Sequence, residues 1–126
     1  QGFDLLVLDA FSGDAVPLHL LTSEAFELYL QHTAPDGLVA VNVSNRYFDL
    51  SLQVYRLAEA FDLAAARVED RGDGLQSYDS VWMLLARQPE ALAIPGIEAR
   101  QMLHPALPEG FRLWTDDYSN LLRVLR

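Results

Sequence analysis

The sequence predicts an α/β domain with the element order β-α-β-α-β-β, followed by an irregular carboxyl-terminal segment. Two continuous apolar runs of strand length, residues 4–10 and 38–44, indicate strands that are buried on both faces, as in a parallel sheet. Segments with helical spacing alternate with these strands, which is typical of a layered structure with right-handed crossovers. The 126 residues, of which 51% are hydrophobic, are enough for a single domain over residues 1–126.

The first strand leads through a long connection with Gly13 and Pro17 to the first helix. Thr22 is the predicted N-cap of this helix, and Glu24 lies in its first turn, where the helix dipole favours a negative charge. The helix is predicted to run to about residue 33. Its apolar face is formed by Phe26, Tyr29 and Leu30.

The segment 34–37 has the sequence APDG and predicts a turn, because Pro35 ends a helix and Gly37 accepts a positive φ. The second strand follows at residues 38–44. Asp49 is placed to cap the second helix, whose apolar residues recur at helical spacing. These residues are Leu50, Val54, Leu57, Ala58 and Phe61.

Two further strands are predicted at residues 64–70 and 80–87. A polar loop with glycines, and no helix, separates them, so we expect them to pair as an antiparallel hairpin. Four prolines after residue 88 divide the chain into short pieces, with one helix expected near residues 97–103. Residues 113–126 are expected to form a loop followed by a short helix.

Composition excludes several classes of partner and site. The formal net charge of -9, from 9 Lys and Arg against 18 Asp and Glu, argues against nucleic acid or an anionic membrane surface as a partner. The absence of cysteine excludes a thiolate metal site, and the three histidines share no metal-ligand spacing, so no metal site is predicted. No apolar run reaches the roughly 18 residues of a membrane span, so we expect no membrane contact by this segment.

Asp9 and Asp14 lie at and just after the end of the first strand, where ligands bind in open α/β sheets. Two neighbouring carboxylates can hold a substrate ammonium group, and one of them can accept its proton. An amine attacks as a nucleophile only when it is deprotonated, so this pair fits amine alkylation. The structural alternative is that Asp14 caps a turn with Ser12 and Gly13 while Asp9 binds loop amides.

Three motifs occur together in this chain: DAFSGDA followed by an apolar residue and proline (residues 9–17), SNRY (44–47) and TDDYS (115–119). On these motifs the chain resembles the spermidine synthase-like proteins, and more closely their bacterial group, which is often fused to transporter-like membrane helices. The resemblance covers most of the chain and is weakest over residues 88–113. It implies the carboxyl-terminal half of a catalytic domain with a Rossmann-like class I methyltransferase sheet, in which parallel strands precede a reversed hairpin.

The resemblance implies aminopropyl transfer from decarboxylated S-adenosylmethionine to a polyamine amine. Asp14 matches the base that activates the amine, and Asp9 matches a carboxylate that orients the substrate and borders the cofactor. True spermidine synthases carry Asp-x-x-Asp-Pro at this position, whereas four residues separate the two aspartates here and Ala15 replaces the proline. Methyl transfer from S-adenosylmethionine is therefore the alternative. The family's glycine-rich cofactor loop does not occur in these 126 residues, so we expect this chain alone to be inactive.

Six more residues become candidates for the substrate site through the same motifs. Asn45, Arg46 and Tyr47 belong to SNRY, and Asp116, Asp117 and Tyr118 belong to TDDYS. The structural alternatives are an ordinary loop for the first three residues and capping of the final short helix by Asp117, and for Asp117 we favour the structural role.

Two other classes of function are considered. A signalling receiver domain also ends a buried strand in an aspartate, but it needs a lysine at a strand end, and the sequence holds none. The remaining alternative is a non-catalytic interaction or dimerisation domain of the same fold. In either form the chain is expected to be cytoplasmic, or the soluble domain of a larger membrane-fused protein.

The implied sheet places the first strand centrally, next to a strand of the cofactor-binding half. Without that neighbour one edge of an apolar strand is unpaired and prone to association. We therefore expect the edge to be covered by the missing amino-terminal half or by a second copy of the chain, in a homodimer. The expected substrate is a small-molecule amine.

Overall fold

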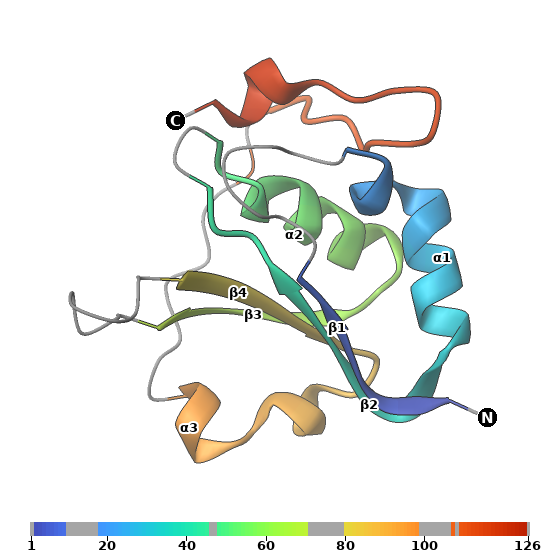
Figure 1. The fold of residues 1–126 in the computed structure, drawn as a ribbon, viewed down its shortest axis with the longest axis vertical. Helices are drawn as coiled ribbons and strands as arrows, with labels where there is room; N and C mark the ends of the chain where they lie inside the picture. The colour runs from blue at the N-terminus through green and yellow to red at the C-terminus, as the bar shows by residue number, and fades with distance from the viewer. Residues whose placement is uncertain are drawn as a thin grey trace.

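The computed structural model describes residues 2–9, 18–45, 48–70, 80–98, 107 and 109–125. At its centre lies a four-stranded sheet in the order β1-β2-β4-β3 (Figure 1). The strands are β1 (Phe3–Leu8), β2 (Thr33–Asn42), β3 (Ala64–Asp70) and β4 (Ser80–Ala86). The α-helices are α1 (Ser23–Gln31), α2 (Ser51–Ala60) and α3 (Pro95–Glu98). The 3-10 helices are η1 (Leu18–Leu21), η2 (Pro89–Leu92) and η3 (Leu121–Val124).

The directions of the strands confirm the α/β class and the predicted order of elements. β1 is parallel to β2, and β4 is antiparallel to both of its neighbours, β2 and β3. The expected hairpin of the last two strands is therefore confirmed. Because β4 lies between β2 and β3, the strands β2 and β3 run in the same direction without touching, and the sheet is mixed.

The core lies between one face of the sheet and the helices α1 and α2 (Figure 1). The helices direct apolar side chains toward alternate residues of the strands, as the helical spacing predicts. Those with at most 2% of their surface exposed include Phe26, Val54, Leu57, Val39, Val41, Met83 and Leu85. On the opposite side of β2, Ala40 is buried and Leu38 and Asn42 are half-buried, so the predicted burial on both faces holds only in part.

Helix α1 begins as predicted and ends two residues earlier than expected. The Thr22 hydroxyl accepts the N–H of Ala25 at 3.3 Å and so caps the first turn. At the other end, Arg87 follows β4 and donates hydrogen bonds to the carbonyls of Leu30, Thr33 and Ala34. One guanidinium group thereby holds the junction of α1 and β2 against the end of β4.

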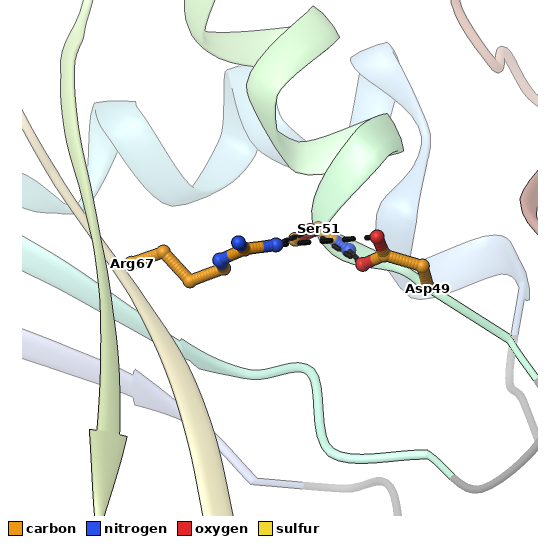
Figure 2. A network of polar contacts seen from close by, with 3 residues as sticks. All are labelled: Asp49, Ser51 and Arg67. Carbon is orange, nitrogen blue, oxygen red and sulfur yellow. Dashed lines mark hydrogen bonds and ion pairs between the residues drawn. The ribbon is translucent and has the colours of Figure 1, made fainter. Parts of the chain in front are cut away.

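Asp49 contacts the start of α2, but it is not the N-cap as predicted: the N-cap is Leu50, whose side chain makes no capping hydrogen bond. The Oδ1 of Asp49 accepts the N–H of Ser51 at 3.2 Å and the hydroxyl of Ser51 at 2.5 Å. Figure 2 shows Arg67 reaching from β3 toward this corner, where it donates to the Ser51 hydroxyl at 3.2 Å and lies 4.0 Å from Asp49 Oδ2. The network joins the start of α2 to the edge strand β3.

The turn predicted for APDG is wrong, because residues 34–37 lie within β2. The pairing of β1 with β2 shifts here: Phe3 faces Thr33, but Leu5 already faces Leu38. The extra residues of β2 are accommodated in this irregular stretch. Gly37 allows the backbones of β1 and β2 to lie close together, and it does not adopt a positive φ. A Cβ added there would lie 2.8 Å from the carbonyl oxygen of Phe3.

The prediction that the first strand is buried on both faces is wrong for β1. Its side toward α1 and α2 is partly buried at Leu6 and Leu8, but Phe3, Leu5 and Val7 on the other side are exposed. The reason is the position of β1 at the end of the sheet. On that face η2 contacts β2, β4 and β3, and Figure 1 shows η2 and α3 below the sheet, away from the α1 side.

The carboxyl-terminal segment returns to the α1 side of the sheet (Figure 1). The buried amide of Gln53 on α2 holds it: Nε2 donates to the carbonyl of Leu21 at 2.8 Å, and Oε1 accepts the N–H of Trp114 at 3.2 Å. The expected final helix is η3, and the expected helix near residue 97 is α3, which starts at Pro95; residues 99–106 lie outside the described part. Within the described ranges, no helix is long and apolar enough to cross a membrane.

Candidate functional site

The carboxyl ends of β1 and β2 bring a carboxylate and an amide together. Asn42 ends β2, and its Nδ2 donates a hydrogen bond to Asp9 Oδ1, directly after β1, at 2.8 Å. The Oδ1 of Asn42 accepts the N–H of Ser44 at 3.0 Å, which fixes the orientation of the amide. Because the strands are parallel, their carboxyl ends meet at one edge of the sheet, where ligands bind in open α/β sheets. Asp9 is exposed there and so is accessible to a ligand.

Asn42 is a site residue that the sequence analysis missed. It directly follows the apolar residues 38–41 of β2, and a polar residue at the end of such a run is the signal that identifies it. Ser44 continues the network, since its hydroxyl accepts the N–H of Val81 at 2.7 Å. The orientation of Asp9 is thereby linked through β2 to the start of β4.

The SNRY candidates are described only in part. Asn45 Oδ1 accepts the N–H of Phe48 at 2.9 Å, so this side chain shapes the loop between β2 and α2, as the structural alternative requires. Arg46 and Tyr47 lie outside the described residues, as does Asp14, the proposed base. The structure therefore describes Asp9 of the predicted carboxylate pair and does not describe its partner.

The TDDYS candidates lie in a tight turn. The N–H of Thr115 donates to the carbonyl of Tyr118 at 2.8 Å, and the N–H of Tyr118 donates to the carbonyl of Thr115 at 3.1 Å. The guanidinium of Arg112 lies 4.0 Å from the centre of the Tyr118 ring, which is a cation–π contact. The capping role favoured for Asp117 is wrong: this residue is inside the turn, well ahead of η3, and its N–H donates to the Thr115 hydroxyl at 3.2 Å.

The turn is fastened to the first turn of α1 by polar contacts. The Thr22 hydroxyl donates to Asp116 Oδ1 at 2.7 Å. The N–H of Asp116 donates to both carboxylate oxygens of Glu24, at 3.1 and 3.2 Å. The carbonyl of Trp114 accepts the N–H of Ser23 at 2.9 Å. Thus Asp116 rather than Asp117 is the aspartate of the motif that joins the turn to α1.

A pocket of about 810 Å³ lies where η1 and α1 meet this turn. Its walls combine apolar side chains with two carboxylates, Glu24 and Asp116. The hydroxyl of Ser23 and the N–H of Asp116 hold the pKa of Glu24 below its usual value, although burial works in the opposite direction. The pKa of Tyr29, which also lines the pocket, is raised by burial. No motif in the sequence predicts this pocket.

The two acidic regions are separate in their contacts. Among the described residues, no hydrogen bond joins Asp9 or Asn42 to the turn 115–118. The described ranges also hold no group of three or more His, Cys, Asp or Glu residues that could bind a metal ion. Both regions present carboxylates to the surface: Asp9 at the strand end, and Glu24 and Asp116 at the pocket.

Comparisons of this sequence with protein-family models and with curated proteins find no match.

Proposed function

We propose that this chain forms the acceptor side of a transferase site in a domain of the spermidine synthase-like type, where the carboxylates that follow β1 hold an alkyl amine. The observation that carries the proposal is the position of Asp9. It lies at the carboxyl end of β1, accepts a hydrogen bond from Asn42 on the neighbouring parallel strand, and is exposed. A carboxylate at such an edge is suited to an ammonium ligand.

The strand order supports the same proposal. The parallel pair β1 and β2 is followed by the antiparallel hairpin of β3 and β4, in the sheet order β1-β2-β4-β3. Parallel strands followed by a reversed hairpin are what the resemblance implies for the second half of a class I methyltransferase sheet. In that sheet the cofactor-binding strands would lie beyond β1, at the edge that β1 leaves unpaired within the described chain.

The chemistry divides between the residues of this chain and a cofactor. Asp9 orients the amine, and Asp14 takes its proton so that the nitrogen lone pair becomes available for attack. Decarboxylated S-adenosylmethionine would supply an aminopropyl group, and S-adenosylmethionine a methyl group. The four-residue spacing of the two aspartates and the presence of Ala15 keep methyl transfer as the second candidate.

The residues of this chain do not fit the nucleoside part of either cofactor. Binding the nucleoside calls for a glycine-rich turn after a strand, and the sequence contains no such motif. The connection after β1 carries aspartates instead, and its one glycine is Gly13. We therefore assign the amine to this chain and leave the cofactor to another segment.

The proposal is tested by titrating 1,4-diaminobutane into the chain in a calorimeter. We expect saturable binding that weakens at least tenfold in Asp9→Asn, because the substitution removes the charge and keeps an acceptor oxygen for Asn42. Asp36→Asn is the matched control, since Asp36 is an exposed carboxylate near the amino end of β2. Equal weakening in both variants, or no saturable binding at millimolar amine, would refute the assignment. Micromolar affinity for either cofactor would refute the division between amine and cofactor.

A further inference from the structure

The pocket beside the first turn of α1 is the feature from which a further inference follows. Its volume of about 810 Å³ lies within the range of roughly 300–1,000 Å³ that is typical of small-molecule sites. Its walls come from η1, α1 and the turn that begins at Thr115, and Figure 1 shows the carboxyl-terminal segment passing beside η1 and the start of α1. Such sites combine mostly apolar walls with a few polar groups that orient the ligand, and this pocket has both.

The apolar wall of the pocket continues along α1 to an exposed leucine. Leu28 lies four positions after Glu24, so the two side chains share one face of the helix. Although it lines the pocket, the Leu28 side chain is 56% exposed and so has apolar surface left to cover. The wall is rigid at Tyr29, whose hydroxyl donates to the carbonyl of Leu20 at 2.9 Å and whose ring packs edge-on against Phe26. An apolar ligand body can therefore bind to a wall that is already formed.

The polar end of the pocket is negative. Glu24 and Asp116 lie next to each other there, because the N–H of Asp116 donates to both carboxylate oxygens of Glu24. Neither carboxylate forms an ion pair with a described residue, including His19 in the pocket wall. The Oδ1 of Asp116 accepts the hydroxyl of Thr22 at 2.7 Å, and its Oδ2 has no partner among the described residues. Neutral donors thus fix both carboxylates without cancelling their charge, so this end of the pocket attracts a cation.

We propose that this pocket binds a small organic monocation, whose ammonium group lies at Glu24 and Asp116 and whose aryl or alkyl body lies along Leu28. An anionic ligand is disfavoured by the two carboxylates. A short diamine is disfavoured as well, because its second charge would lie against the apolar wall. The inference does not depend on the proposed transferase function, in which a diamine binds at Asp9, outside this pocket.

Titration of 4-phenylbutylammonium chloride into the chain, followed by nuclear magnetic resonance, tests the site directly. We expect saturable shifts of the Leu28 methyl signals and of the main-chain amide signals of Glu24 and Asp116. The alcohol 4-phenylbutan-1-ol has the same apolar body without the charge and should bind at least about tenfold more weakly. Equal affinities for the amine and the alcohol, saturable shifts at Asn42 alone, or no saturation at millimolar amine overturn the proposal. Titration of 1,4-diaminobutane should leave the pocket signals unchanged, and saturable shifts there would also overturn it.

One substitution tests the charged end of the pocket. Glu24→Gln removes a charge but keeps an oxygen that can accept the N–H of Asp116, so binding of the amine should weaken at least about fivefold. Binding of the alcohol should change little. Glu27→Gln is the matched control, because Glu27 is an exposed carboxylate of the same helix and does not belong to the described lining of the pocket. Equal effects of the two substitutions on the amine overturn the proposal.

A second substitution tests the apolar wall and leaves the polar contacts of the first turn intact. Leu28→Ala should weaken binding of the amine and of the alcohol alike, by about threefold or more. Leu5→Ala is the control, since Leu5 is 53% exposed and lies on β1, away from the pocket. Unchanged affinity in Leu28→Ala, or an equal loss in Leu5→Ala, overturns the proposal. Circular dichroism confirms that each variant is folded.

Discussion

Replacing Gln53 by leucine should destabilise the domain strongly, because its amide is completely buried and bridges two main-chain groups. Nε2 donates to the carbonyl of Leu21 and Oε1 accepts the N–H of Trp114, at 2.8 and 3.2 Å. Leucine has a similar size but leaves both main-chain groups unpaired. Each unsatisfied buried group costs about 1–3 kcal/mol. Leucine avoids the desolvation cost of the buried amide, which offsets part of this loss. The expected net loss is about 2–4 kcal/mol in the free energy of unfolding.

Urea unfolding followed by tryptophan fluorescence measures this loss, because Trp114 is buried beside the substitution. With a slope of about 1–3 kcal/mol per molar urea, the midpoint should fall by roughly 1 M or more. Gln31→Leu is the control at an exposed glutamine of α1, where a change of about 0.5 kcal/mol or less is expected. If Gln53→Leu unfolds at the same urea concentration as the control variant, the bridge between α2 and the carboxyl-terminal segment does not contribute as argued.

Two other predictions concern β2 and the first turn of α1. Gly37→Ala should lower the free energy of unfolding by about 1–3 kcal/mol, because the new Cβ would press on the Phe3 carbonyl, and amide exchange in β1 should accelerate. Unchanged exchange would contradict the close approach. Glu24 has a lowered pKa, so its stabilising contribution is present above the ordinary pKa of 4.5 and is lost as the pH falls through the lowered value. Glu24→Gln should flatten the loss of stability below pH 4.5, and an unaltered acid profile would count against the hydrogen bonds that Glu24 accepts from Ser23 and Asp116.

The presence of all four strands could be predicted from the sequence, but the burial of each strand could not. The bounds of β3 agree with the predicted 64–70, and those of β4 differ by one residue, because turn residues enclose each run. The run in β1 has the same local signal as β2, yet β1 is half exposed, because burial depends on which elements lie beside a strand. Likewise Pro35 and Gly37 have the composition of a turn, but pairing with β1 places them in a strand.

The position of the candidate site could be predicted from the sequence, but the hydrogen-bond partners of its residues could not. Parallel strands place their carboxyl ends together, so the position of Asp9 followed from the order of elements alone. Its partner Asn42 is 33 positions away, and only the register of β1 against β2 brings the two together. In the second region, the motif offered both Asp116 and Asp117, and only the folded turn shows that Asp116 is the one that contacts the first turn of α1.

The most direct test of the account is to follow the side-chain amide of Asn42 by nuclear magnetic resonance while 1,4-diaminobutane is added. Its Nδ2 group donates to Asp9, so an amine bound at that carboxylate must perturb the amide signal. We predict a saturable shift of this signal that disappears in Asp9→Asn. Saturable shifts at Glu24 and Asp116, with the Asn42 signal unchanged, would place the amine in the pocket beside α1 and contradict the proposed site.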